Sequence, residues 1–381
     1  MVAALTETPA AAFDPARCPR LVVKIGSSLL VDGAGQVREH WLAGVVADLA
    51  ARRHAGQQIV IVSSGAIALG ARRLGLDKGG RASLEDAQAA AAVGQVALAG
   101  VWQQLLGAAG LTAAQVLLTL GDLEDRRRYL NVAATIARLL DLGAVPVLNE
   151  NDTVATAEIR YGDNDRLAAR AAQAAGATGV ILLSDVDGLY TANPASDPTA
   201  QRLPVVRALT PEVMAMATGE TRSGMGSGGM AAKLLAARMA GAAGITLAIC
   251  DGRVDRPLQH FAQSGGGTLF LPPRNARGRK AWLAGRITVA GTLQVDAGAA
   301  AALKRGASLL AAGVTGVDGK FRRGDVVAIL GPAGELLGRG LAAYDAADAM
   351  AIRGRRNDDQ AGVLGYAPRA ALVHADHLVL I

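Results

Sequence analysis

Short, uninterrupted runs of apolar residues alternate with helix-length segments over the first two thirds of the chain. The runs end in polar stretches that contain glycine, and a strand that is apolar on both faces is typical of a parallel sheet covered by helices. We therefore predict an α/β fold, a three-layer αβα sandwich with a mainly parallel sheet. The predicted strands are residues 20–25, 59–62, 114–119, 145–148, 179–183 and 246–250, and the main predicted helices are about 40–55, 67–74, 126–140, 166–175 and 229–240.

Composition supports a folded protein whose partners are anions. Hydrophobic residues make up 51% of the 381 residues and charged residues 19%, so a large core is expected. The net charge of +6 is compatible with nucleic acid, nucleotides or acidic metabolites. The two cysteines, Cys18 and Cys250, are too few for a disulfide framework and favour a reduced, cytoplasmic setting.

Two segments raise the question of targeting or membrane insertion. Residues 1–18 are rich in Ala and Pro and lack a basic start followed by an apolar block, so we expect a disordered lead rather than a secretory signal. Residues 87–121 carry no charge, but five glutamines interrupt them. We therefore expect a buried helix followed by a buried strand there, and no membrane span.

The character of the chain changes after the last predicted strand of the sheet. A glycine run, two prolines and the basic residues Arg274, Arg277, Arg279 and Lys280 predict a linker. Short strands separated by glycine turns follow and predict a small β-rich barrel. The expected organisation is a lead at 1–18, the α/β domain at 19–272, a linker at 273–284 and the β-rich domain at 285–381.

Polar segments follow the first two predicted strands. Lys24 precedes a turn at Gly26, where a positive charge and exposed N–H groups suit phosphate; a surface lysine beside an ordinary turn is the alternative. Residues 63–66 (Ser-Ser-Gly-Ala) suit a carboxylate or phosphate, or supply a helix N-cap. Because ligands of such sheets bind beyond the carboxyl ends of the strands, we treat these segments as one site.

Acidic and amide side chains gather after the strand at 145–148. Residues 149–152 read Asn-Glu-Asn-Asp, and residues 161–166 read Tyr-Gly-Asp-Asn-Asp-Arg just before a helix. A carboxylate here would hold a substrate ammonium group. Helix capping by Asn164 or Asp165 is the alternative, but it explains one residue and not the cluster.

Two further segments suit a nucleotide. Residues 184–190 place Ser184 and Asp185 at a strand end, where the alternative is a turn with a helix cap. Residues 224–233 form a glycine-dense loop that opens a helix carrying Lys233, a combination that favours phosphate, although a flexible loop is the alternative. The loop lacks the Gly-Lys-Ser/Thr of a Walker A motif, and the protein-kinase motifs are missing.

Taken in order, these segments resemble the glutamate 5-kinases of the amino acid kinase family, from about residue 19 to the C-terminus. The matching segments are residues 21–28, 59–68, 90–95, 147–152, 158–165, 182–185 and 226–230. The resemblance implies the amino acid kinase fold with a C-terminal PUA domain, ATP and Mg²⁺, and L-glutamate phosphorylated on its side-chain carboxylate in the first step toward proline. It also implies a homo-oligomer inhibited by proline.

The resemblance carries over to individual residues. It implies that Lys24 and Lys233 bind phosphate, and that Ser64, Asp152 and Asn164 bind glutamate. The nucleotide-binding set that it implies is Lys24, Ser184, Asp185, Gly226, Ser227, Gly228, Gly229, Met230, Ala231, Ala232 and Lys233. Ala232 replaces a threonine common in the family, and Leu120 replaces a common arginine. The metal ligands are not identified by this comparison.

A carboxylate substrate sets the chemistry expected of the site. A glutamate side chain is already ionised at neutral pH, so no general base is needed. The difficulty is to bring an anion against a polyanion, which Lys24 and Lys233 would ease. We expect Asp165 to hold the two lysines, with Asp163 as the alternative for this role or for approaching the metal through water. An N-acetylglutamate kinase, or an RNA-binding protein with a vestigial kinase domain, are the alternative functions; nucleic-acid binding through the C-terminal domain is not expected.

Overall fold

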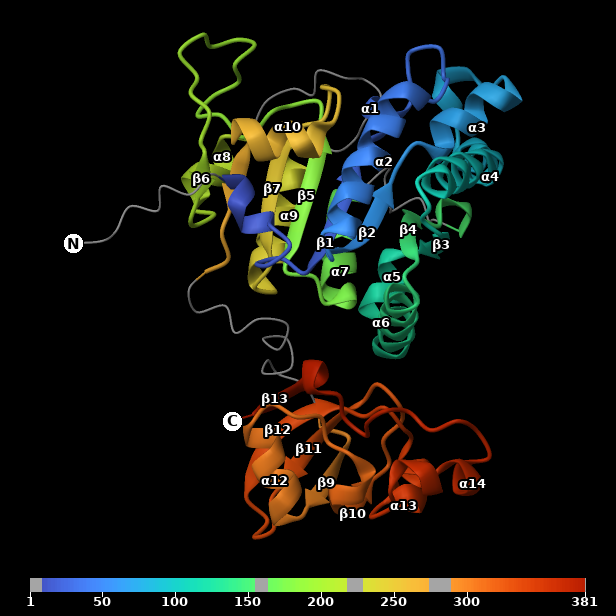
Figure 1. The fold of residues 1–381 in the computed structure, drawn as a ribbon, viewed down its shortest axis with the longest axis vertical. Helices are drawn as coiled ribbons and strands as arrows, with labels where there is room; N and C mark the ends of the chain where they lie inside the picture. Colours follow the sequence, from blue (N-terminus) through green and yellow to red (C-terminus); the bar gives the residue numbers. More distant parts are fainter. Residues whose placement is uncertain (1–8, 155–163, 218–228, 274–288, 381) are drawn as a thin grey trace, which may run out of the picture. The chain divides into compact units, whose positions relative to one another are not determined.

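The computed structural model describes residues 9–154, 164–217, 229–273 and 289–380. The chain divides into two compact units, which are treated separately below (Figure 1). The first unit comprises Met1–Leu123 and Val132–Ala276, and the second comprises Glu124–Asn131 and Arg277–Ile381.

The first unit is built on one mainly parallel sheet, which has eight strands in the described part of the chain. In spatial order the strands are β3 (Ala113–Leu118), β4 (Val145–Glu150), β2 (Gln58–Ser63), β1 (Arg20–Ile25), β5 (Gly179–Ser184), β7 (Thr246–Asp251), β8 (Thr268–Phe270) and β6 (Val205–Val206). Only the β7–β8 pairing is antiparallel among these strands. All six predicted strands are present, with ends that differ by at most two residues, whereas β6 and β8 were not predicted.

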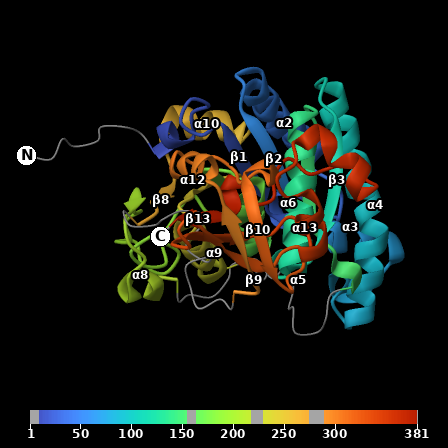
Figure 2. The ribbon, with the colours of Figure 1, turned by 90° about the horizontal axis from the view of Figure 1, so that it is seen from below.

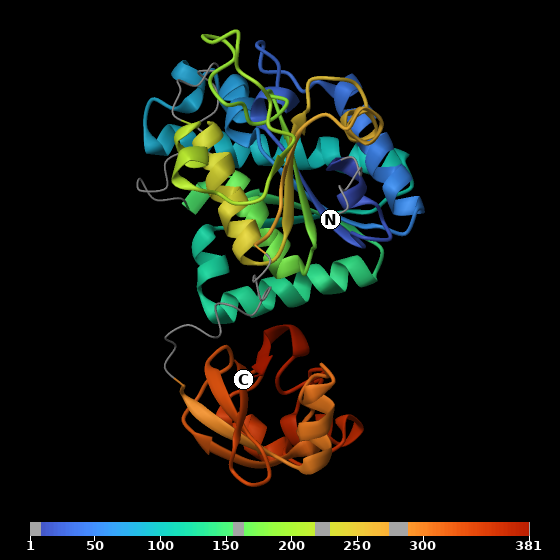
Figure 3. The ribbon, with the colours of Figure 1, turned by 90° about the vertical axis from the view of Figure 1, so that its left-hand side faces the viewer.

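Helices cover both faces of this sheet, which confirms the predicted three-layer arrangement (Figure 3). Helices α2, α4 and α10 pack on one face, and α7 and α9 on the other. The helices of this part of the chain are α1 (Ser27–Leu30), α2 (Glu39–His54), α3 (Ala66–Leu74), α4 (Leu84–Ala108), α5 (Leu120–Glu124), α6 (Arg126–Asp141), α7 (Asn164–Ala175), α8 (Pro211–Ala215), α9 (Met230–Ala242) and α10 (Pro257–Ser264), with 3₁₀ turns η1 (Pro9–Phe13), η2 (Asp77–Gly80) and η3 (Asp152–Val154).

The alternation of side chains along the strands decides which residues face which helices. Leu21, Val23 and Ile25 of β1 belong to the core shared with α2, α4 and α10. Because successive side chains point to opposite faces, Val22 and Lys24 face α7 and α9. Lys24 is therefore directed into the layer where Asp165 and Lys233 are found.

Residues 9–18 differ from the prediction of a disordered lead over residues 1–18, whose first eight residues lie outside the described part of the chain. Residues 9–18 are folded, with Phe13 and Cys18 buried. The side-chain amide of Gln57 donates to the Phe13 carbonyl over 2.9 Å and to the Cys18 carbonyl over 2.5 Å. Burial of Phe13 against Phe261 stabilises this segment, a contact that its Ala/Pro-rich composition did not indicate.

The uncharged segment forms α4 and β3, and it is less buried than predicted. Within the described residues α4 is the helix long and apolar enough to cross a membrane, on length and composition alone. In the structure it packs on α3 and on the sheet. Strand β3 lies at the edge of the sheet, so it pairs on one side only and Leu117 is 38% exposed. The prediction of a fully buried strand was therefore wrong.

The second unit is a small β-rich fold with a core of its own, as predicted. Its strands are ordered β10 (Val314–Gly319), β9 (Gly291–Val295), β11 (Val326–Leu330), β12 (Leu336–Leu341) and β13 (Leu378–Leu380). Strands β9, β10 and β13 are labelled in Figure 2. Its helices are α12 (Ala297–Lys304), α13 (Ala346–Ile352) and α14 (Ala361–Leu364), and its 3₁₀ turns are η5 (Ala311–Gly313), η6 (Asn357–Asp359) and η7 (Ala375–His377). Gly319 and Gly324 adopt positive φ at two of the predicted turns.

Candidate active site

The carboxyl ends of four neighbouring strands bring the predicted polar segments to one edge of the sheet. In the order β4, β2, β1 and β5, these ends carry Asn149, Ser63, Lys24 and Ser184. The chain winds outward from β1 in one direction through β2 and in the other through β5, so β1 and β5 form a topological switch point. Ligands of open α/β sheets bind at such a point.

Three charged side chains from distant parts of the sequence meet there. The Nζ of Lys24 lies 2.6 Å from Oδ1 of Asp165, and the Nζ of Lys233 lies 3.1 Å from Oδ2 of the same carboxylate. Lys24 comes from β1, Asp165 from the first turn of α7, and Lys233 from the first turns of α9. All three are buried, with exposed fractions of 6%, 1% and 6%. The structure thus places Asp165 between the two lysines.

Burial and mutual attraction shape the ionisation of this cluster. Burial lowers the pKa of Lys24, and the nearby charge of Asp165 opposes that shift. Burial alone would raise the pKa of Asp165, but the two lysines hold it below its usual value. An ionised Asp165 balances one of the two ammonium groups in direct contact with it. The remaining positive charge makes the cluster a favourable place for an anion.

The backbone around this cluster is open to phosphate. Helix α9 begins at Met230 behind the N-cap Gly229, which has no side chain with which to cap the first turn. A helix N-terminus can bind an anion through its N–H groups and its dipole. A Cβ atom built on Gly26 would lie 3.8 Å from Nζ of Lys24 and 3.9 Å from the Leu183 carbonyl oxygen. Glycine at position 26 keeps the space in front of Lys24 free for a ligand.

The predicted nucleotide-binding residues are only partly described. Gly229, Met230, Ala231, Ala232 and Lys233 lie at the start of α9. Gly226, Ser227 and Gly228 lie outside the described residues, as does Asp163. On the other side of β1, the hydroxyl of Ser184 donates to Oδ1 of Asp185 over 3.2 Å, and the charge of Asp185 acts on Lys24. Ser184 and Asp185 thus lie near the lysine cluster rather than capping a helix.

A network of uncharged polar groups lies on the β2–β4 side. Nδ2 of Asn164 donates to the Ser64 hydroxyl over 2.6 Å, to Oδ1 of Asn149 over 3.1 Å and to the Ser63 carbonyl over 3.3 Å. Gly65, and not either serine, is the N-cap of α3. Oδ1 of Asn164 is buried and accepts no hydrogen bond from the described residues. A buried acceptor in this position suits a donor on a bound substrate.

Asp152 lies just beyond this network, in η3. Its carboxylate is half-buried, and burial raises its pKa to about 6, against the lowering effect of Arg81. It will therefore be ionised at neutral pH yet poorly solvated. A cationic group of a ligand would compensate it.

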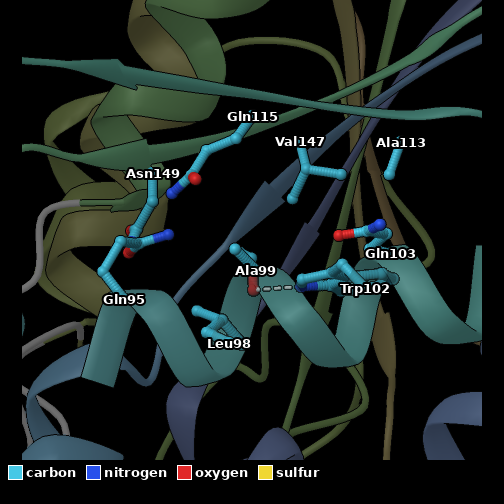
Figure 4. A pocket seen from close by; sticks show the side chains of 10 residues that line it. Gln95, Leu98, Ala99, Trp102, Gln103, Ala113, Gln115, Val147 and Asn149 are labelled. Atoms are coloured by element: carbon cyan, nitrogen blue, oxygen red, sulfur yellow. Dashed lines mark hydrogen bonds between the residues drawn. The ribbon is translucent and has the colours of Figure 1, made fainter. Parts of the chain in front are cut away.

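Sequence reasoning missed the side chains that support the network from α4. Oε1 of Gln95 accepts from Nδ2 of Asn149 over 2.7 Å, and the indole N–H of Trp102 donates to the Ser63 hydroxyl over 3.0 Å. These groups line a cavity of about 150 Å³ between α4 and strands β3 and β4 (Figure 4). The glutamines of this segment had indicated that it does not span a membrane, and Gln95 ended the matching segment 90–95 without a role being assigned to it. The sequence did contain a signal that could have identified these two side chains: the spacing of Gln95 and Trp102 places both on one face of a helix.

The described residues do not offer a carboxylate cage for a metal. They include no cluster of three or more His, Cys, Asp or Glu side chains in metal-binding proximity. Both oxygens of Asp165 face ammonium groups. The donor set therefore fits nucleotide phosphates directly, and fits Mg²⁺ as an ion that is bound by those phosphates.

The chain is similar to known proteins over nearly its whole length. The amino acid kinase family matches residues 19–251, and the PUA domain matches residues 291–364. A protein named glutamate 5-kinase from Sphingopyxis alaskensis is 63% identical over 97% of this chain and 99% of its own length. Another from Novosphingobium aromaticivorans is 62% identical over 96% of each chain. Among solved structures, a UMP kinase from Bacillus anthracis is 14% identical with a TM-score of 0.46, covering 67% of this chain and 96% of its own.

Proposed function

The chain belongs to the amino acid kinase family, and from that premise we propose that it transfers the γ-phosphoryl group of ATP to the side-chain carboxylate of L-glutamate. The product is L-glutamyl 5-phosphate, and the reaction is the first step of proline biosynthesis. The observation that carries the proposal is the meeting of Lys24 and Lys233 on Asp165 at the switch point of the sheet. Identity above 60% over nearly the whole chain to proteins named glutamate 5-kinase supports the choice of substrate.

The reaction makes simple demands on the protein. A carboxylate oxygen of glutamate forms a bond to the γ-phosphorus of ATP, the bond from that phosphorus to the β–γ bridging oxygen breaks, and ADP leaves with the electron pair. The attacking group is already an anion, so no side chain has to remove a proton. The protein must instead gather positive charge and N–H dipoles around the transferring group.

We assign the phosphate side of the site to β1 and α9. Lys24 and Lys233 stabilise the negative charge of the transferring group, and the N-terminus of α9 binds phosphate oxygens. Asp165 touches both lysines and keeps them in place. Ser184 and Asp185 at the end of β5 complete the nucleotide side, together with residues 226–233, of which Met230 to Lys233 begin helix α9. Mg²⁺, when bound with the nucleotide, supplies further neutralisation of phosphate charge.

We assign the glutamate side to the network beyond β2 and β4. Asp152 pairs with the α-ammonium group, a role that its partly desolvated carboxylate supports. Ser64 and Asn164 orient the substrate. Oδ1 of Asn164, which accepts no hydrogen bond from the part of the chain that the structure describes, accepts one from the ammonium group. An N-acetylated substrate has no ammonium group for either acceptor. The comparisons do not favour the N-acetylglutamate kinase or a vestigial, RNA-binding protein.

The remaining properties are proposals of the same kind. Buried, unpaired Cys18 and Cys250 support a reducing, cytoplasmic location.

Exposed apolar side chains on α4 and β3, with Val96 75% exposed, support assembly into a homo-oligomer. Proline is the expected feedback inhibitor, and glutamate is the expected small-molecule partner. Nucleic acid would bind through the PUA domain, but it is not an expected partner of this chain.

The test compares two substrates as acceptors of the phosphoryl group. The purified protein is incubated with ATP and Mg²⁺, and ADP release is measured with L-glutamate and with N-acetyl-L-glutamate. We expect ADP release and a hydroxylamine-trappable acyl phosphate with glutamate only. Equal or greater release with the acetylated compound contradicts the proposal. Tight, salt-dependent RNA binding without ATP turnover would support the vestigial alternative instead.

A further inference from the structure

Gln95 has no role in the site described so far, although it contacts that site from α4. We propose that Gln95 is a positioning residue for glutamate: it orients the carboxamide of Asn149, and through it that of Asn164, without touching the substrate. This inference rests on the proposed function and deepens its account of the glutamate side.

The evidence is a continuous chain of hydrogen bonds between three side-chain amides. Oε1 of Gln95 accepts from Nδ2 of Asn149 over 2.7 Å. Oδ1 of Asn149 accepts from Nδ2 of Asn164 over 3.1 Å. Asn164 then contacts Ser64, which is assigned to the substrate site. Figure 4 shows Gln95 and Asn149, the first two members of the chain, beside the cavity at α4. From Asn149 the chain continues through Asn164 toward the proposed position of the glutamate ammonium group.

In this series of hydrogen bonds, the orientation of each side-chain amide depends on the amide before it. A carboxamide presents an oxygen on one side and an N–H₂ group on the other. With the Gln95 oxygen facing Asn149, the oxygen of Asn149 must face Asn164, and the oxygen of Asn164 is left for the substrate. The backbone N–H of Glu150 also donates to Oδ1 of Asn149, over 2.9 Å, and favours the same orientation. In this orientation Nδ2 of Asn149 points toward α4 and needs a hydrogen-bond acceptor there. Oε1 of Gln95 is that acceptor.

The burial of Asn149 makes that acceptor important. Asn149 is 2% exposed, so its Nδ2 group depends on the protein for a partner. Without the Gln95 oxygen, rotation of the Asn149 side chain into the adjoining cavity becomes more favourable, and Asn164 loses the contact that directs its oxygen. The lysine cluster is carried by β1, α7 and α9 and shares no hydrogen bond with Gln95 among the described residues. A defect at Gln95 should therefore affect glutamate binding and spare ATP.

The experiment uses side chains of similar length in the full-length enzyme. Gln95→Met removes the acceptor, Gln95→Glu keeps an acceptor at the same reach, and Gln103→Met is the control on the same helix and in the same cavity. We expect Gln95→Met to raise the KM for glutamate on the order of tenfold, as substitutions behind a liganding residue do. The KM for ATP should stay within about twofold, and Gln95→Glu should recover most of the loss. Gln103→Met should behave as wild type.

The outcomes separate this inference from the proposed function. Wild-type protein that does not phosphorylate glutamate overturns the proposed function and this inference with it. Active wild type with an unchanged glutamate KM in Gln95→Met overturns the inference alone. Equal increases in the KM for ATP and for glutamate, or no recovery in Gln95→Glu, point to general disruption of α4 and also overturn it. If Gln95→Met is insoluble, Gln95→Asn, whose side chain is too short for the 2.7 Å contact, carries the same expectation.

Discussion

The carboxylate of Asp165 lies 2.6 Å from the ammonium group of Lys24, in a site where both side chains are buried. Its other oxygen lies 3.1 Å from Lys233, so one acidic residue sets the positions of two cations from opposite ends of the kinase domain. Such an arrangement is prepared for a phosphoryl group before any ligand arrives, because the lysines need not be gathered during the reaction.

Replacing Lys233 should impair turnover much more than glutamate binding. We expect Lys233→Met and Lys24→Met each to lower kcat on the order of a hundredfold or more, because each removes a preorganised charge at the transferring phosphoryl group. The KM for glutamate should change little. Arg238→Met, an exposed position on the same helix α9, is the matched control. Steady-state kinetics that show only a raised glutamate KM would contradict the assignment.

Neutralising Asp165 should destabilise the fold as well as the site. Asp165→Asn removes the carboxylate charge that contacts both buried ammonium groups, and breaking such a buried pair typically costs about 3–5 kcal/mol. The wild-type pKa is lowered in the folded state, so the contribution of Asp165 is present above its unfolded pKa and is lost as pH falls through the lower, folded value. Urea unfolding should show a large difference between the two proteins at pH 7 that narrows only under strongly acidic conditions. A constant difference down to pH 3 would refute this account.

The position of Lys24 followed from the sequence, because a strand of known phase places it at the carboxyl end and parallel strands bring such ends together. The contact of Asp165 with both lysines did not follow from local pattern, which left Asp163 as an alternative for this role. The contact of Gln95 with Asn149 did not follow, because helix periodicity shows which residues share a face but not which strand that face meets. The edge position of β3 was missed for a related reason: strand order is decided by crossover connections between distant segments. Phe13 and Cys18 were likewise misjudged, since their burial depends on partners far along the chain.

The raised pKa of Asp152 predicts a pH dependence of glutamate use. Burial raises this pKa to about 6, and only the ionised carboxylate can pair with the substrate ammonium group. We expect kcat/KM for glutamate to rise about tenfold per pH unit below pH 6 and to level off above it, and Asp152→Asn to lose this dependence with a higher glutamate KM. Glu85→Gln, at an exposed acidic residue, is the control. An unchanged KM in Asp152→Asn would remove Asp152 from the substrate site.

The raised pKa of Asp152 also affects the stability of the folded protein, which it lowers as pH rises. An acid whose folded pKa exceeds its unfolded value binds its proton more tightly in the folded state, so its contribution to stability falls as pH rises through about 6. At pH 7.5 the charged Asp152 is therefore unfavourable for folding. We expect the thermal midpoint of Asp152→Asn to equal or exceed that of the wild type at this pH. A clearly lower midpoint would show that Asp152 is held by contacts that stabilise its charge.

The close crossing of α3 and α4 provides the last prediction, because it fixes the helix that carries Gln95. A Cβ atom on Gly94 would lie 1.7 Å from the Ala66 carbonyl oxygen and 2.7 Å from the backbone nitrogen of Gly70. These are backbone atoms that cannot turn aside, so Gly94→Ala must separate the helices, at a cost of about 1–3 kcal/mol or more. Gly100→Ala, on the same helix with open space around it, should instead stabilise by about 0.5–1 kcal/mol. We expect urea unfolding midpoints to move in opposite directions and the glutamate KM to rise in Gly94→Ala only. Equal midpoints for the two variants would mean that the helices do not touch through glycine.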